Sequence, residues 1–160
     1  MTALRQPTPA NLKILSLARD VLDIEARAIE GLAVHIDEHF LAAHQLMLKC
    51  RGRIVVSGMG KSGHIANKIA STLASTGTPA FFMHPGEAGH GDLGMITRQD
   101  VILALSWSGE TVELKNILTY SRRFTVPLIS ITSGAQSALG KASDVCLELP
   151  KAKEACPHGL

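Results

Sequence analysis

The short apolar runs of this sequence constrain its fold more than any other feature. Val101-Ile102-Leu103-Ala104 is one of them, and runs of the same kind recur from Ile54 onward. They contain mostly valine, isoleucine and leucine and do not alternate with polar residues, which is typical of parallel strands covered on both faces. The sequence therefore predicts an α/β fold, an open parallel sheet with helices on both sides.

Helical segments precede and separate the predicted strands. Apolar residues spaced by threes and fours predict two helices between Asn11 and Cys50, with a break at Gly31. Strands are then expected at 53–57, 80–83, 101–106, 128–132 and 145–149, and helices at 62–76, 110–123 and 136–142. We interpret residues 1–50 as N-terminal helices that pack on the domain and take part in oligomer contacts, and residues 51–160 as one domain.

Charge and composition exclude several classes of function. The 16 lysines and arginines and the 14 acidic residues nearly balance and are scattered along the sequence, and aromatic residues are few, so nucleic-acid binding is not expected. No apolar run is long enough to span a membrane, and the first residues lack the apolar core of a signal peptide. The three cysteines form no CxxC pair, which favours a reducing compartment. We expect a cytoplasmic protein without membrane partners.

The loop after the first predicted strand, Ser57 to His64, is rich in glycine. Its GMGKSG matches GxGxxG, but the next strand ends in Met83-His84 rather than in an acidic residue for a ribose, which argues against a dinucleotide site. A P-loop would need glycine where Val55 stands, so ATP hydrolysis is not expected. Two alternatives stay open: N–H groups at the start of a helix that bind an anion, or a tight turn with Ser62 as N-cap.

A second polar loop, SWSGETVE, follows the strand predicted at 101–106. Ser106, Ser108 and Thr111 precede a predicted helix there, and hydroxyl groups with a helix dipole can bind a phosphate without a lysine. The alternative is that Ser108 only caps the helix and that Glu110 and Glu113 stabilise its first turn. We favour that alternative for Glu110, whereas Glu113 lies one turn deeper and is a candidate for chemistry.

A third loop, Met83 to Ile96, holds two histidines and two acidic residues among four glycines. His84 and His90 are suited to metal binding or proton transfer near neutral pH, although bracing of the loop is an alternative. A zinc ion could take one or both, with Glu87, Asp92 or water as further ligands. Three histidines on a predicted helix are interpreted as surface residues: His35, His39 and His44.

Four segments, GMGKSGH, STGTPAFFMHPGEAGHGDLGMI, SWSGET and KEACPHGL, together resemble the sugar isomerase (SIS) domain of the arabinose 5-phosphate isomerases of Gram-negative bacteria. The resemblance runs from about Arg53 to the last residue. It implies a three-layer αβα sandwich with a five-stranded parallel, flavodoxin-like sheet. It also implies a cytoplasmic enzyme that interconverts ribulose 5-phosphate and arabinose 5-phosphate on the way to the Kdo sugar of lipopolysaccharide.

The chemistry of such an isomerase needs no cofactor. An enediol route needs a base that moves a proton between C1 and C2, a group that shuttles hydroxyl protons, and an electrophile for the developing oxyanion. The resemblance implies roles in turnover for Lys61, Glu113 and Glu154, and we expect His90, which it implies meets the substrate, to be catalytic as well. It implies ligand contacts for Gly77, Thr78, His84, His90 and the stretch 116–125. It also links His84 to zinc, which we interpret as inhibitory because no ligand set for a catalytic metal is visible.

We therefore expect four hydroxyl residues to hold the phosphate: Ser62, Ser106, Ser108 and Thr111. Glu113 is the leading candidate base, and Lys61 is expected to stabilise negative charge near C1 or C2. Which acid acts at which carbon stays open. The competing hypothesis is a sugar-phosphate sensor module of the kind found in transcription regulators, which needs the hydroxyl loops but no base.

Three further expectations concern the whole chain. The helices before Lys49 carry more apolar residues than one layer over a sheet needs, and SIS relatives associate through such helices, so a homodimer or homotetramer is expected. Trp107 stands where the family has asparagine, a bulky change in the second polar loop. The resemblance also implies that the family continues past Leu160 into helices with a further catalytic histidine, usually followed by two CBS modules. These 160 residues are thus expected to bind arabinose 5-phosphate but to isomerise it poorly, as part of a longer protein.

Overall fold

The computed structural model describes residues 8–156, which divide into two units. One unit contains helix α1 (Pro9–Leu32) and the C-terminal segment from Pro150, and the other runs from His35 to Leu149. Thr8 caps α1, because its hydroxyl accepts a hydrogen bond from the Asn11 amide at 3.3 Å. None of the residues of α1 is buried, although several are large and apolar.

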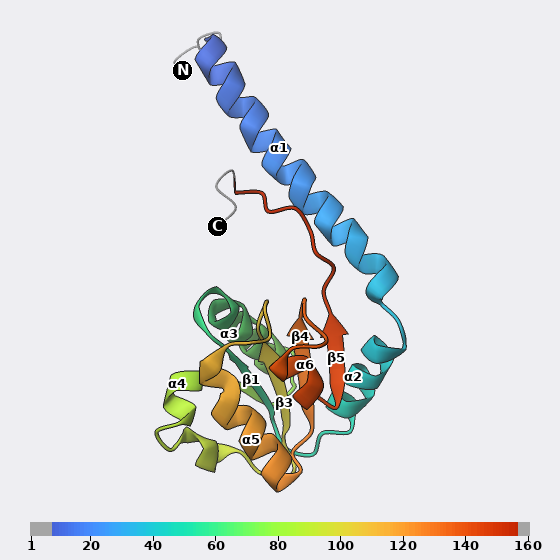
Figure 1. Cartoon of the computed structure of the whole chain (residues 1–160), viewed down its shortest axis with the longest axis vertical. Helices are drawn as coiled ribbons and strands as arrows, with labels where there is room; N and C mark the ends of the chain where they lie inside the picture. The colour runs from blue at the N-terminus through green and yellow to red at the C-terminus, as the bar shows by residue number, and fades with distance from the viewer. Residues whose placement is uncertain (1–7, 157–160) are drawn as a thin grey trace. The chain divides into compact units, whose positions relative to one another are not determined.

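The second unit is built on a parallel sheet of five strands in the order β2-β1-β3-β4-β5. The strands are β1 (Ile54–Gly58), β2 (Ala80–Met83), β3 (Val101–Leu105), β4 (Leu128–Thr132) and β5 (Val145–Glu148). Each boundary lies within one residue of the one predicted from the sequence. The parallel α/β sheet with helices on both faces is therefore confirmed (Figure 1).

Helices cover the sheet in two layers (Figure 1). One layer consists of α2 (Glu38–Leu48) and α3 (Gly60–Ser75), and the other of α4 (Pro85–Ala88), α5 (Lys115–Phe124) and α6 (Ala138–Ala142). Three short 3₁₀ turns connect the elements: η1 (Ala33–His35), η2 (Asp92–Met95) and η3 (Val112–Leu114). Ala43 and Leu46 of α2 pack in the core on one face of the sheet, so α2 belongs to the unit that runs from His35 to Leu149.

Successive residues of each strand point to opposite faces of the sheet and pack in two separate hydrophobic cores. In β1, Val55 points into the core under α4, α5 and α6, whereas Ile54 and Val56 point into the core under α2 and α3. All three are at most 1% exposed. Burial on both faces explains why the strands read as continuous apolar runs.

The strand order places a switch point between β1 and β3. From β1 the chain crosses to β2 on one side and then returns to β3 on the other, so β1 and β3 are neighbours and Gly58 pairs with Leu105. In sheets of this kind ligands bind beyond the carboxyl ends of the strands at this point. We call the side of the sheet at which the strands end the carboxyl edge, and the side at which they begin the amino edge.

Close contact between α3 and β1 depends on glycine. A Cβ atom added to Gly63 would lie 2.6 Å from the carbonyl oxygen of Gly58, and one added to Gly58 would lie 2.9 Å from the carbonyl oxygen of Ser62. The start of α3 therefore lies directly against the end of β1, at the switch point.

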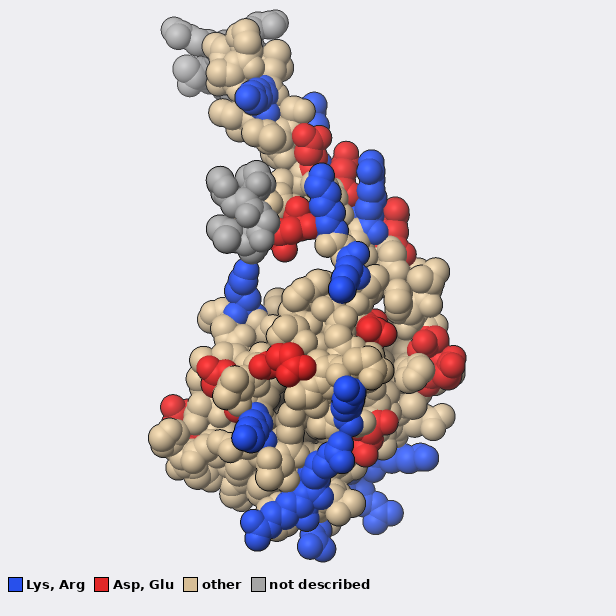
Figure 2. All heavy atoms as spheres, in the orientation of Figure 1, with Lys and Arg blue, Asp and Glu red and all other residues tan. Residues whose placement is uncertain are grey.

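Lysine and arginine are not scattered over the sheet unit, contrary to the impression from the sequence. Seven of them lie in the segments that precede the strands at the amino edge: Lys49, Arg51, Arg53, Arg98, Arg122, Arg123 and Lys141. Figure 2 shows such side chains gathered at the end of the molecule where the strands begin. The buried carboxylate of Asp100 fastens this edge, because it accepts hydrogen bonds from the amides of Arg53 and Thr97, each at 2.7 Å.

Within residues 8–156, no helix is long and apolar enough to cross a membrane.

Candidate functional site

The loop after β1 presents the start of a long helix. Helix α3 begins at Gly60, two residues earlier than predicted, and its N-cap residue Met59 makes no capping hydrogen bond with its side chain. Gly60 has a φ of 57°, a conformation that favours glycine. The first helical bond runs from the Gly63 amide to the Met59 carbonyl at 3.2 Å, so the N–H groups of the three residues before Gly63 have no partner within the helix.

These N–H groups belong to Gly60, Lys61 and Ser62 and lie at the positive end of the helix dipole. Ser62 is half-buried in the first turn, so the alternative in which it serves as N-cap is wrong. Lys61 is exposed beside it. Free N–H groups of this kind can bind an anion, and N-capping by Ser62 does not occupy them.

The loop after β3 is held in one shape by its own hydroxyl groups and by β4. Ser106 is 4% exposed, and its Oγ lies 2.7 Å from Thr111 Oγ1 and accepts a hydrogen bond from the Gly109 amide at 3.1 Å. The carbonyl oxygen of Trp107 accepts three further bonds, from Thr132 Oγ1 at 3.1 Å and from the amide and hydroxyl of Ser133 at 2.9 and 2.8 Å. The loop is therefore rigid before any ligand arrives.

Among the three hydroxyl residues of this loop, Ser108 is the exposed one. Its Oγ accepts a bond from the Glu110 amide at 3.2 Å, which leaves the O–H free to donate. The hydroxyls of Ser106 and Thr111 face each other instead. The prediction that a helix begins at residue 110 is wrong. The turn η3 follows Thr111, and α5 begins only at Lys115. The hydroxyl groups of this loop therefore do not lie at the N-terminus of α5.

The two glutamates that follow have different surroundings. Glu110 Oε1 accepts a hydrogen bond from the amide of Ala138, the first residue of α6, at 2.9 Å. Contrary to our expectation, it therefore stabilises α6 and not the first turn of its own helix. Glu113 is exposed on η3, and among the described residues its carboxylate makes no hydrogen bond. That carboxylate is free to act on a ligand.

Both histidines of the third loop lie beyond the end of β2. His84 caps α4, because its Nδ1 accepts a bond from the Gly86 amide at 3.2 Å, which leaves Nε2 as its available nitrogen. His90 is exposed after the same helix. Across residues 8–156, no three histidine, cysteine or acidic side chains are grouped so that they could hold a metal ion, so a zinc ion here would need water among its ligands.

Gly77 and Thr78 do not join this site within one chain. They lie between α3 and β2, and the Thr78 amide bonds to the Leu73 carbonyl at 2.9 Å, which closes the end of α3. Because they precede β2, they are at the amino edge, opposite the loops that follow β1 and β3. The stretch 116–125 runs along α5 and also reaches the amino edge at Thr125.

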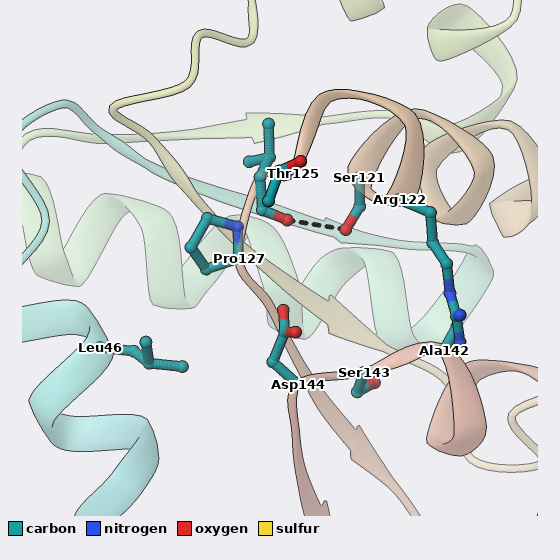
Figure 3. A pocket seen from close by; sticks show the side chains of 9 residues that line it. Leu46, Ser121, Arg122, Thr125, Pro127, Ala142, Ser143 and Asp144 are labelled. Carbon is teal, nitrogen blue, oxygen red and sulfur yellow. Dashed lines mark hydrogen bonds between the residues drawn. The ribbon is translucent and has the colours of Figure 1, made fainter.

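A pocket of about 490 Å³ lies at the amino edge, beneath the starts of β4 and β5 (Figure 3). Several of its polar groups are already engaged: Ser121 Oγ donates to the Val126 carbonyl at 2.7 Å, Arg122 donates to the Lys141 carbonyl at 2.9 Å, and Asp144 accepts from the Leu128 amide at 2.8 Å. The carboxyl edge offers unpaired donors instead. We therefore assign the site to the carboxyl edge and not to this pocket.

Glu154, the remaining candidate, lies on the C-terminal segment of the other unit and is exposed. The residues that the sheet unit places at the carboxyl edge are those of its three loops: Lys61, Ser62, His84, His90, Ser106, Ser108, Thr111 and Glu113. Met59 and the amide of Gly60 also belong there. Sequence reasoning did not single out Met59, but the anion-binding helix start that it left open for this loop includes the Gly60 amide.

Comparisons with known proteins identify the domain family and relatives of this chain. Residues 47–159 match the SIS domain family. The arabinose 5-phosphate isomerase KdsD of Escherichia coli K12 is 51% identical over 142 residues, which cover 89% of this chain and 43% of that protein. The enzyme of the same name from Pseudomonas aeruginosa is 49% identical over 150 residues, 94% of this chain and 46% of that protein. The chain thus spans less than half the length of these curated relatives.

Solved structures show the same fold. The E. coli CFT073 protein c3406, solved in complex with arabinose 5-phosphate, is 39% identical and superposes with a TM-score of 0.89 over 94% of this chain and 80% of that one. A phosphoheptose isomerase from Francisella tularensis, 20% identical with a TM-score of 0.66 over 92% of this chain and 88% of that one, shows the likeness of the fold alone. With the sheet order, the two glycine- and hydroxyl-rich loops and these matches together, the chain belongs to the SIS domain family.

Proposed function

We propose that this chain is the sugar-phosphate domain of an isomerase that interconverts D-arabinose 5-phosphate and D-ribulose 5-phosphate. Two loops lie at the switch point of the sheet. One has unpaired N–H groups, and the other has hydroxyl groups fixed by their own hydrogen bonds. These loops, in a chain about half identical to isomerases of that name, are the observation that carries the proposal. A phosphate is the anion that such loops suit best.

The phosphate is held at the start of α3 and at Ser108. The amides of Gly60, Lys61 and Ser62 donate to its oxygens, and the Ser62 and Ser108 hydroxyls add further donors. Ser106 and Thr111 keep the second loop in shape through their mutual bond and contribute to binding in that way. This division of roles refines the expectation that all four hydroxyls contact the phosphate.

The chemistry then proceeds on the other end of the sugar. A base removes the proton from C2 of the aldose, the C–H electron pair forms the C1=C2 double bond, and the carbonyl oxygen on C1 takes up a proton, which gives the enediol. The hydroxyl on C2 then loses its proton to become the carbonyl, and C1 receives a proton, which gives the ketose. We assign Glu113 as the leading base, His90 as a carrier of hydroxyl protons and Lys61 as the group that stabilises the negative oxygen.

The remaining parts of the proposal follow the resemblance. Glu154 takes part in turnover, no cofactor is required, and zinc bound at His84 inhibits. The product feeds the synthesis of the Kdo sugar of lipopolysaccharide, in a cytoplasmic homodimer or homotetramer. The free thiols of Cys50 and Cys146 agree with a reducing compartment.

Hydrogen exchange at C2 tests the proposal and separates it from the sensor hypothesis. Arabinose 5-phosphate is incubated in D₂O with the longer protein of which this chain is expected to be a part, and loss of the C2 proton signal is followed by NMR. We expect exchange by the wild type, a decrease of about 100-fold to 10,000-fold in Glu113→Gln, and little change in Glu110→Gln, whose side chain stabilises α6.

Binding without any exchange by the longer wild-type protein would favour the sensor. Exchange at the wild-type rate in Glu113→Gln would remove Glu113 as the base.

A further inference from the structure

Trp107 is an exposed aromatic residue whose main chain is fixed. Three hydrogen bonds hold its carbonyl oxygen to Thr132 and Ser133 at the end of β4, yet its side chain is 54% exposed. Among the described residues the indole belongs to neither core cluster. The protein thus places a large apolar side chain at the carboxyl edge without burying it in the fold.

A second apolar side chain lies on the neighbouring loop. Met59 directly follows β1 and is 37% exposed, and Trp107 lies two residues beyond the end of β3. Gly58 and Leu105, the last residues of these strands, pair with each other. Because neighbouring strands lie only about 5 Å apart, Met59 and Trp107 belong to loops that leave the sheet at adjacent points of the switch point.

The polar groups of the same two loops face a different part of a ligand. The amides at the start of α3 and the Ser108 hydroxyl suit a phosphate. A sugar phosphate carries, beyond the phosphate, a carbon chain with C–H faces and hydroxyl groups. Ligand sites commonly combine a few fixed polar groups with apolar and aromatic walls, and an indole offers both an apolar face and one N–H donor.

We propose that Trp107 and Met59 form the wall against which the carbon chain of the bound sugar packs, with the indole ring as its main surface. This inference rests on the proposed function, because it assumes that the ligand is a phosphorylated sugar held by the two loops. It makes Trp107 a residue that discriminates a sugar phosphate from phosphate alone. The residue acts in binding and takes no part in proton transfer.

Fluorescence gives a direct measurement, because Trp107 is the one tryptophan of the chain. Its emission is followed while arabinose 5-phosphate, ribose 5-phosphate, glucose 6-phosphate or inorganic phosphate is added, and affinities are measured by calorimetry for the wild type and for variants. Trp107→Asn removes the wall and Trp107→Phe keeps an aromatic face. Val112→Asn is the matched control, because Val112 is an apolar side chain on the neighbouring turn that is 78% exposed.

At least one sugar phosphate is expected to shift or quench the emission. Trp107→Asn should weaken its binding roughly tenfold, Trp107→Phe and Val112→Asn should stay within about threefold of the wild type, and the affinity for inorganic phosphate should be the same in all four proteins. If a sugar phosphate other than arabinose 5-phosphate changes the emission, the proposed substrate is wrong, but the inference that Trp107 and Met59 contact the sugar is supported.

Two results would overturn the inference. One is tight binding of arabinose 5-phosphate with unchanged emission and unchanged affinity in Trp107→Asn, which leaves the proposed function intact. The other is the absence of binding by all the sugar phosphates, which overturns both.

Discussion

Two buried serines on the strands that flank β3, one on β1 and one on β4, differ in whether their hydroxyl groups are paired. Ser57 and Ser130 are both fully buried, and Ala104 of β3 pairs with both of them across the sheet. Ser57 Oγ donates to the Met83 carbonyl at 2.7 Å, whereas Ser130 Oγ has no hydrogen-bond partner. A buried hydroxyl without a partner costs free energy, and a paired one does not.

Replacing each serine by alanine should therefore change stability in opposite directions. Ser130→Ala is expected to raise the free energy of unfolding by about 1 kcal/mol, and Ser57→Ala to lower it by about 1 kcal/mol. Urea denaturation of the two variants beside the wild type measures both changes. Destabilisation by both substitutions would show that Ser130 has a partner in solution.

The expected zinc inhibition depends on two single residues, His84 and His90. His84 offers Nε2 because Nδ1 accepts the Gly86 amide, and His90 is exposed nearby in the chain. With no group of three ligands among the described residues, zinc would be held weakly, by one or two histidines and water. We expect micromolar zinc to slow exchange at C2, a chelator to restore it, and His84→Gln to reduce the inhibition about tenfold or more.

Activity that rises with zinc and falls with a chelator would contradict the inhibitory assignment. His44→Gln is a suitable control, since His44 is an exposed residue of α2 outside the site.

At the scale of the element, the contact between α3 and β1 depends on Gly63. An added Cβ would lie 2.6 Å from the Gly58 carbonyl, and that backbone cannot move without disturbing β1. Gly63→Ala is expected to lower the free energy of unfolding by about 2 to 3 kcal/mol. Gly60→Ala meets no atom within 4 Å and carries only the cost of its φ of 57°, about 1 kcal/mol.

Thermal or urea denaturation compares the two glycine variants. A loss in Gly63→Ala no larger than the loss in Gly60→Ala would show that α3 can shift away from β1 and that the close contact is not essential.

The strands could be predicted from the sequence to within a residue because their burial on both faces leaves a simple apolar signature. The start of the helix after β3 could not be predicted from the sequence. Gly109 has a φ of 69°, and its carbonyl accepts the Leu139 amide at 3.0 Å, so the chain bends and contacts α6 before η3 begins. That contact joins residues far apart in the sequence, as does the bond from Ala138 to Glu110, and local patterns do not record either.

The same reason limited the prediction of the site. Loop composition identified Ser62, Ser108 and Glu113 as candidates, and all three lie at the carboxyl edge. Ser106, two residues before Ser108, has the same hydroxyl group, but it is buried and hydrogen-bonded to Thr111, which only the folded loop reveals. Gly77 and Thr78 were predicted from resemblance, and the topology places them at the other edge of the sheet.

For the whole molecule, the exposed face of α1 supports the expected homodimer or homotetramer. Leu15, Leu22 and Ile29 recur at intervals of seven, which places them on one side of the helix, and they are 46%, 67% and 68% exposed. Such a row would gain free energy by burial against a second copy. Light scattering at micromolar concentration should report a dimer or a tetramer.

The variant Leu22→Ser/Ile29→Ser should lower the molar mass at the same concentration. Lys13→Ser/Asp20→Ser, which changes polar residues of the same helix, should not. A monomeric wild type would refute the expectation.

The most direct test of the account is to map where the ligand binds on the sheet. Amide chemical shifts of the isotope-labelled chain are recorded while arabinose 5-phosphate is added. The account predicts the largest changes at Gly60, Lys61 and Ser62 and in the loop 107–111, because the phosphate is bound by the loops after β1 and β3. Changes confined to Thr125, Ser143 and Asp144, around the pocket at the amino edge, with both loops unaffected, would contradict it.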